Sequence, residues 1–119
     1  MYDIKEILLK NNTHEKKRLV ITFYDEAMAI VGEFLMTDAP LMDGEVTRVI
    51  ETVLQGELAE TTFTGQRCHL KITDTETTIE DLYEDIAGMI PLNAYTIPTE
   101  TLLELTYMWL GRLLSLNNE

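Results

Sequence analysis

The sequence predicts one α+β domain, in which a small antiparallel sheet with a central hairpin at about residues 57–73 packs against amphipathic helices. Apolar and polar residues alternate on both sides of Gly65, as they do in paired strands. After Thr99, leucines recur with the spacing of one helix face, which predicts a C-terminal helix at about residues 100–116. A chain of 119 residues, 45% of them apolar, has the size of an ordinary globular domain, so residues 1–119 are assigned to it.

The N-terminal third is expected to hold a helix, a strand and a second helix. The apolar residues of segment 2–12, YDIKEILLKNN, have helical spacing, and its two asparagines would end the helix. Segment 18–24, RLVITFY, is rich in β-branched and aromatic residues and predicts a strand. Segment 25–36, DEAMAIVGEFLM, fits either a continuing pair of strands or a helix interrupted by Gly32, and we favour the helix.

The middle of the chain is expected to form a loop, a helix and the hairpin. Proline, glycine and aspartate mark residues 37–45 as a loop, and residues 44–56 then place one apolar face on a helix that Gly56 ends. That face consists of Val46, Val49, Ile50, Val53 and Leu54. In the hairpin, Gly65 and Gln66 suit a two-residue turn with positive φ at the glycine. The apolar face of the second strand would hold Cys68, Leu70 and Ile72, and its polar face a basic stripe of Arg67, His69 and Lys71.

Segment 77–86, TTIEDLYEDI, admits two interpretations. The apolar residues Ile79, Leu82, Tyr83 and Ile86 have helical spacing, and Thr77 with Glu80 has the form of a capping box. A short helix would turn its four acids toward solvent. Alternatively, Thr78 and Glu80 continue the alternation of the preceding strands, and the segment continues the sheet. Residues 94–97, AYTI, predict a last strand, and Thr99 a helix N-cap. The apolar stripe of the final helix consists of Leu102, Leu105, Trp109, Leu113 and Leu116.

Charge is the strongest functional signal in the composition. The chain has 21 acids and 9 bases, a formal charge of −12 and a pI near 4.4. This disfavours direct binding to nucleic acid, which requires Lys and Arg, and favours basic partners. Between Lys71 and Arg112 there is no base, while eight acids lie there: Asp74, Glu76, Glu80, Asp81, Glu84, Asp85, Glu100 and Glu104. The alternative is that the acidity serves solubility alone.

Residue types with catalytic potential are poorly placed for it. Ser115, the only serine, lies in an apolar helix, and Cys68 is expected on the apolar side of the hairpin, with His69 on the other face. Carboxylates could bind a hard cation at Asp38, Asp43 and Glu45, but their spacing lacks the alternate-residue acids of an EF-hand loop. The acids at residues 80–85 would be exposed neighbours on a helix, with no histidine nearby in sequence. We therefore expect no enzyme, no cofactor and no bound metal. A lone cysteine and the absence of a signal peptide or a membrane-spanning apolar run predict a cytoplasmic protein.

Two segments carry a resemblance to a known class of proteins. Residues 62–72, TFTGQRCHLKI, and residues 95–113, YTIPTETLLELTYMWLGRL, resemble small bacterial immunity proteins that neutralise the toxic C-terminal domains of contact-dependent inhibition and related polymorphic toxins. The resemblance implies a cytoplasmic protein that binds one cognate toxin domain, often a nuclease, and blocks its active site or its access to a target.

On this interpretation the acids between Lys71 and Arg112 are the expected contact surface for a basic toxin. They are Asp74, Glu76, Glu80, Asp81, Glu84, Asp85, Glu100 and Glu104, with Asp38, Asp43 and Glu45 as a second patch. Two alternatives stay open: an acidic adaptor or DNA-mimicking regulator that binds a basic host protein, and a carboxylate-metal enzyme.

Overall fold

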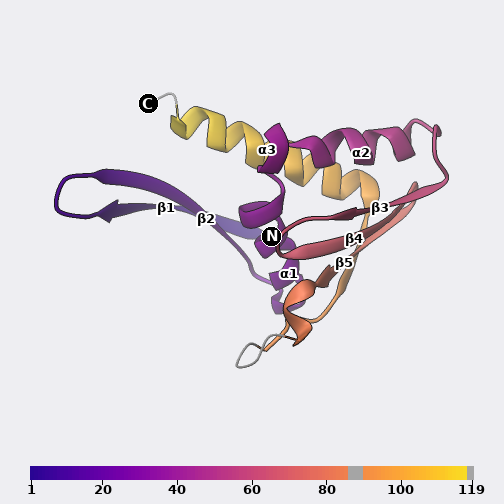
Figure 1. Cartoon of the computed structure of the whole chain (residues 1–119), viewed down its shortest axis with the longest axis horizontal. Coiled ribbons are helices and arrows are strands. Elements are labelled where there is room, and N and C mark those ends of the chain that lie inside the picture. The colour runs from indigo at the N-terminus through magenta and orange to yellow at the C-terminus, as the bar shows by residue number, and fades with distance from the viewer. Residues whose placement is uncertain (86–89, 118–119) are drawn as a thin grey trace.

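The computed structural model describes residues 1–85 and 90–117 and has the expected α+β fold (Figure 1). Its strands and helices in chain order are β1 (Tyr2–Lys10), β2 (Glu15–Phe23), α1 (Ala29–Glu33), α2 (Glu45–Leu54), β3 (Glu60–Thr64), β4 (Cys68–Thr73), β5 (Glu76–Asp81), β6 (Tyr95–Pro98) and α3 (Thr99–Asn117). Single turns of 3₁₀-helix occupy Glu26–Met28, Leu41–Asp43 and Leu82–Asp85, and a π-helical turn occupies Phe34–Asp38. The helices expected at residues 25–36, 44–56 and 100–116 are thus confirmed.

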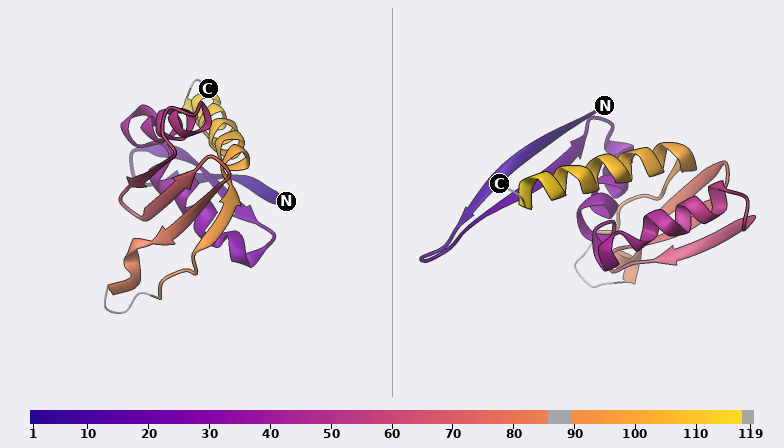
Figure 2. Two further views of the ribbon diagram at one scale, coloured as in Figure 1. Left: turned by 90° about the vertical axis from the view of Figure 1, so that its right-hand side faces the viewer. Right: turned by 90° about the horizontal axis from the view of Figure 1, so that it is seen from above.

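The main sheet is antiparallel with strand order β3-β4-β5-β6. The predicted hairpin is confirmed, with Glu60 opposite Thr73 and Thr64 opposite His69. Helices α2 and α3 lie side by side on one side of this sheet (Figure 2). This layering buries one face of the sheet.

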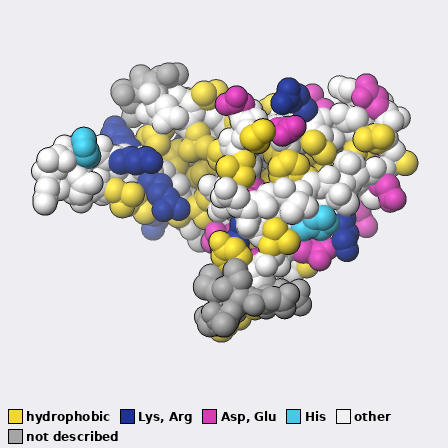
Figure 3. Space-filling view, in the orientation of Figure 1, with side chains coloured by type: hydrophobic (Ala, Val, Ile, Leu, Met, Phe, Trp, Pro, Cys, Tyr) yellow, Lys and Arg dark blue, Asp and Glu magenta, His cyan; other side chains and the backbone are white. Residues whose placement is uncertain are grey.

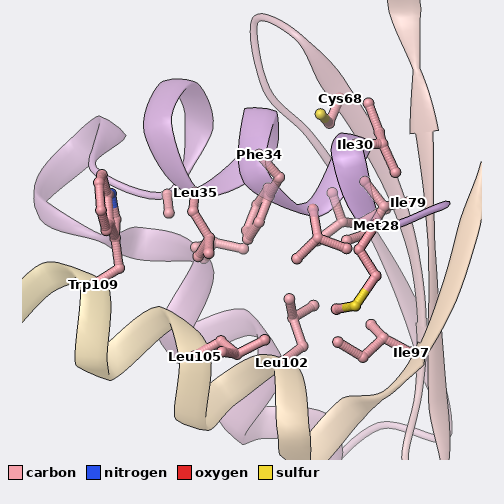
Figure 4. Packing of buried hydrophobic residues seen from close by; sticks show 14 of the residues in the cluster. Met28, Ile30, Phe34, Leu35, Cys68, Ile79, Ile97, Leu102, Leu105 and Trp109 are labelled. Atoms are coloured by element: carbon pink, nitrogen blue, oxygen red, sulfur yellow. The ribbon is translucent and has the colours of Figure 1, made fainter. Parts of the chain in front are cut away.

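The core lies between the main sheet, α3 and the α1 region (Figure 4). Leu70, Ile72 and Ile79 point into it from the alternating positions of β4 and β5, and α3 contributes the predicted stripe of Leu102, Leu105 and Trp109. Each of these side chains is at least nine-tenths buried. Burying a large apolar side chain stabilises the fold by about 1.5–3 kcal/mol, so this stripe holds α3 in place.

The first two strands form a separate two-stranded sheet that projects from the body as a β-ribbon arm (Figure 1). The predicted helix at residues 2–12 is therefore wrong. Tyr2 lies opposite Phe23 and Ile4 opposite Ile21, and the Tyr2 and Phe23 rings pack edge to face at 5.7 Å. These cross-strand contacts outweigh the helical spacing of the apolar residues.

The helix considered for residues 77–86 is also wrong, and the alternative of a continued sheet is right. Thr77, Ile79 and Asp81 are buried on one face of β5, which pairs with β4 on one side and β6 on the other. A central strand gains two ladders of hydrogen bonds, which a two-turn surface helix cannot match. Ile86 lies outside the described residues.

Two local predictions need correction. Gly65 does not have positive φ, and the turn residues of the hairpin are Gln66 and Arg67, since Gly65 N–H donates to the Cys68 carbonyl at 2.9 Å. Thr99 begins α3, but its hydroxyl donates to the Thr73 carbonyl at 2.6 Å instead of capping its own helix.

Candidate functional site

The start of α3 is tied to the turn between β4 and β5, and this contact brings acids together. Besides its bond to the Thr73 carbonyl, Thr99 donates its backbone N–H to the Thr75 carbonyl at 3.2 Å. Its hydroxyl also lies 2.8 Å from the hydroxyl of Thr77, and both side chains are buried. These bonds fix the first turn of α3 beside the β4–β5 turn.

Exposed carboxylates surround this junction. Asp74 lies in the β4–β5 turn, Glu76 begins β5 opposite Pro98, and Glu100 follows Thr99, all three exposed. Glu104 is exposed one turn further along α3, and the pairing of Glu60 with Thr73 adds an exposed acid from β3. We call Glu60, Asp74, Glu76, Glu100 and Glu104 the acidic end. Glu60 was not among the predicted residues, although the hairpin register would have placed it opposite Thr73.

Two of the other predicted acids, Glu80 and Asp81, do not join this surface. Glu80 is half-buried in β5 and pairs with Lys71 at 2.9 Å, and Asp81 is buried. Glu84 and Asp85 lie in the 3₁₀ turn after β5, and their side chains lie outside the described part of the structure. Four of the predicted acids are therefore exposed at this end, and the structure adds Glu60.

Asp81 is part of a buried ion network, not a contact residue. Arg67 forms a two-pronged pair with it, Nε to Oδ1 and Nη2 to Oδ2 both at 3.1 Å, and also approaches Glu33 at 3.7 Å. The guanidinium stacks 4.1 Å above the Tyr83 ring. Asp81 further accepts the backbone N–H groups of Tyr83 and Leu92 at 2.9 and 2.8 Å. The expected basic stripe on β4 is thus interrupted, because Arg67 is engaged inside the protein.

The protonation states of this pair follow from its surroundings. Burial favours the neutral acid, but the hydrogen bonds from Arg67, Leu92 and Tyr83 outweigh it, so the pKa of Asp81 is lowered. For Arg67, burial acts to lower the pKa, while the hydrogen bond and the charge of Asp81 and the charge of Glu33 raise it by more. Both groups are therefore charged at neutral pH.

Asp38, predicted in a second acidic patch, is also a structural residue. Its carboxylate is fully buried at the end of the π-helical turn, and it accepts three successive backbone N–H groups of the hairpin turn. Gln66 and Cys68 donate at 2.8 and 2.7 Å, and Arg67 donates to both oxygens at 3.1 and 3.2 Å. A Cβ at Gly65 would lie 2.6 Å from both carboxylate oxygens, so this position requires glycine for space. Of the second patch, Asp43 is exposed and Glu45 half-buried.

The residues weighed for catalysis lie apart. Cys68 is buried, and burial, followed by the charge of Asp38, raises the pKa of its thiol. The His69 Nδ1 bonds the Thr64 hydroxyl at 2.7 Å on the opposite face of β4. Among residues 1–85 and 90–117, no three His, Cys, Asp or Glu side chains gather as they would around a metal ion.

Charge is separated along the molecule. The arm and its root, residues 1–23, hold three acids and five bases, a formal +2, whereas residues 24–119 hold eighteen acids and four bases, a formal −14. Figure 3 shows Lys and Arg side chains gathered on the arm and most visible Asp and Glu side chains on the body. The body therefore presents a stronger negative field than the net charge of −12 suggests.

Comparisons with known proteins found no matching family model, no matching curated protein and no matching solved structure. In the part of the chain that the structure describes, no helix is long and apolar enough to cross a membrane.

Proposed function

We propose that this chain is a cytoplasmic, non-catalytic binding protein that neutralises a basic bacterial toxin domain through its acidic end. The observation that carries the proposal is the set of five exposed carboxylates that the β3–β4–β5 register and the Thr99 contacts gather at one end of a body of formal charge −14. The resemblance of residues 62–72 and 95–113 to immunity proteins gives the class of partner.

The proposed chemistry is electrostatic complementarity. A nuclease domain needs a basic surface for the phosphates of its substrate, and an acidic surface can occupy it. Long-range attraction would raise the association rate, and the complex would weaken as salt screens the charges. An inhibitor that acts in this way needs no reacting group, cofactor or metal.

Growth rescue and copurification test the proposal. Cells that express the C-terminal domain of the toxin encoded beside this chain should stop growing without it and grow with it. The two proteins should copurify at low salt and separate more readily at high salt. Toxicity that this chain does not relieve would contradict the proposal.

Charge reversal tests the acidic end itself. The double variant Glu76→Lys, Glu100→Lys should lower the association rate about tenfold or more, since it changes the local charge by four units. The matched control is Glu26→Lys, Glu51→Lys, which makes the same change in net charge at residues outside the acidic end. Equal binding by both variants would rule out this surface.

The acidic adaptor remains the second candidate, because the same surface would suit a basic host protein. It predicts that the acidic end captures a basic protein of the host, without rescue from any toxin, and that the Glu76 and Glu100 double variant loses this capture.

A further inference from the structure

The outer edge of β1 has unpaired backbone groups. At the two ends of the arm, Asn11 N–H donates to the His14 carbonyl and Tyr24 N–H to the Met1 carbonyl. Because hydrogen-bonded pairs alternate along an antiparallel ladder, the odd residues of β1 bond to β2 and the even residues turn their N–H and C=O groups outward. In the described part of the chain, no third strand pairs with β1.

This edge faces away from the body. Strand β2 packs against α1 and the π-helical turn, whereas β1 packs on β2 (Figure 2, right). Three consecutive aliphatic residues near the tip, Ile7, Leu8 and Leu9, are 42%, 47% and 47% exposed. A nine-residue open strand with exposed aliphatic residues is a template for pairing with another strand.

The tip sequence is complementary to itself. Residues 6–10 read EILLK, and an antiparallel copy centred on Leu8 places Glu6 opposite Lys10, Ile7 opposite Leu9 and Leu8 opposite Leu8. The three pairs that involve Glu6, Leu8 and Lys10 use the outward-facing even residues, so each can exchange two backbone hydrogen bonds. In this register both charge pairs join unlike charges, and each aliphatic residue lies opposite another aliphatic residue.

Neighbouring registers that also pair even residues with even residues lack this match. Centred on Glu6, the pairing would set two Glu6 carboxylates against each other. Centred on Ile7, it would set Glu6 opposite Leu8 and Lys10 opposite Ile4, and centred on Leu9, Lys10 opposite Leu8. Only the register centred on Leu8 sets unlike charges opposite each other along this tip.

We propose that β1 pairs with β1 of a second copy of this chain about a two-fold axis at Leu8, which forms a continuous four-stranded sheet with the order β2-β1-β1-β2. Such a contact is closed, since each copy offers the same strand to the other. The antiparallel arrangement places the two bodies, each of formal charge −14, at opposite ends of the joined ribbon. It leaves the acidic ends free and does not depend on the proposed function.

The joined sheet would also bury the exposed aliphatic residues. On one face, Ile7 and Leu9 of each copy meet in a block flanked by Arg18 and Lys16, their partners on β2. On the other face the two Leu8 side chains meet, with Lys17 at the flanks. Existing exposed pairs, Glu6 with Lys17 at 3.4 Å and Lys10 with Glu15 at 3.6 Å, would extend into charge rows across the four strands.

Sedimentation velocity on the full chain, at rising concentration, tests the pairing with two charge variants. In a homodimer, Glu6→Lys sets two positive side chains opposite each other in each of the two charge pairs, and Lys10→Glu sets two negative ones there. Each single variant should weaken dimerisation about tenfold to a hundredfold, since two attractive pairs become repulsive. An equimolar mixture of the two variants should dimerise again. In the heterodimer, one charge pair joins the two substituted side chains and the other joins the unmodified Lys10 and Glu6. Both pairs therefore consist of one positive and one negative side chain.

Arg48→Glu is the control, since it makes the same charge change as Lys10→Glu but lies exposed on α2, away from the arm. It should dimerise like the unmodified chain, and circular dichroism should show all variants folded. Two results would overturn the proposal: an unmodified chain that stays monomeric through the millimolar range, or single variants whose mixture fails to associate.

Discussion

At the scale of single residues, two buried aspartates hold the hairpin turn, one through its backbone and the other through the Arg67 side chain. Asp38 binds the backbone N–H groups of residues 66–68, while the Arg67 side chain reaches across to Asp81. A buried carboxylate is costly unless it is fully hydrogen-bonded, and here both are. The conformation of the turn therefore depends on Asp38 and Asp81, which are distant in sequence, more than on the turn residues themselves.

Asp38 and Gly65 should behave as a coupled pair in stability measurements. Gly65→Ala should lower the free energy of unfolding by about 1–3 kcal/mol, because the new methyl group meets the Asp38 carboxylate. Asp38→Ala should cost a similar amount or more, because it leaves backbone N–H groups unpaired. In the Asp38→Ala background, Gly65→Ala should cost far less, since the space is then free. Urea unfolding of all four proteins gives the coupling energy, and additive costs would contradict this account.

The Asp81 carboxylate should make stability depend on pH in the acidic range. Its pKa in the folded chain lies below its ordinary value, so its contribution is complete above the unfolded pKa of about 3.9 and is lost as the pH falls through the folded pKa. Asp81→Asn should unfold more easily at neutral pH, with a loss of about 3 kcal/mol because the largely buried Arg67 loses its two-pronged partner and keeps only Glu33 at 3.7 Å.

The difference in the free energy of unfolding between the unmodified chain and Asp81→Asn should therefore shrink as the pH falls below about 3.9. Glu104→Gln serves as the control, since this exposed acid has no ion pair among the described residues and its replacement should not lower stability at neutral pH. A difference that stays constant from pH 7 down to pH 2 would contradict the assignment.

At the scale of elements, periodicity identified the helices that pack on the core, misjudged β1 and left β5 open between a helix and a strand. In α3, a helix of 19 residues, the leucine stripe extends over many turns, so the helical period is unambiguous. In β1 and β5 the apolar residues are too few to separate a period of 3.6 from a period of 2. Pairing makes both segments strands, β1 with β2 and β5 with β4 and β6, and the apolar spacing within one segment does not report such pairing.

Trp109 offers a test of how α3 is anchored. Its side chain is 1% exposed, and its indole N–H has no acceptor among the described residues. Trp109→Ala should lower the free energy of unfolding by about 3–5 kcal/mol. Trp109→Phe should cost much less, because the ring is largely kept and an unpaired buried donor, which costs about 1–3 kcal/mol, is removed.

Tyr107→Ala is the matched control on the same helix, since Tyr107 is 51% exposed and its loss should change stability by no more than about 0.5 kcal/mol. Denaturant unfolding followed by circular dichroism compares the three variants without relying on tryptophan fluorescence. Equal losses for Trp109→Phe and Trp109→Ala would show that the indole N–H does have a partner.

At the scale of the whole molecule, the sequence predicted an acidic surface but not its composition. Asp74, Glu76, Glu100 and Glu104 follow from the run without bases between Lys71 and Arg112. Asp81 and Asp38 were misplaced because a charge count cannot show which carboxylates meet a buried guanidinium or a row of backbone N–H groups. Glu60 was missed because it joins the others only through strand register.

The same charge separation should make the unmodified chain more stable in salt. Eighteen acids against four bases in residues 24–119 repel one another in the folded state, and this repulsion is screened when the Debye length falls from about 10 Å at 0.1 M salt to about 3 Å at 1 M. The melting temperature should therefore rise with sodium chloride.

Glu76→Gln, Glu100→Gln should melt higher than the unmodified chain at low salt and equally at high salt, because it relieves repulsion at the acidic end. The same variant should bind the basic partner more weakly, so that stability and binding change in opposite directions at these residues. The control Glu6→Gln, on the basic arm, should not raise the melting temperature at low salt, because Glu6 is paired with Lys17. If the melting temperature of the Glu76→Gln, Glu100→Gln variant does not rise at low salt, these carboxylates lie too far apart to repel one another. The acidic end would then lack the charge density needed to attract a basic toxin.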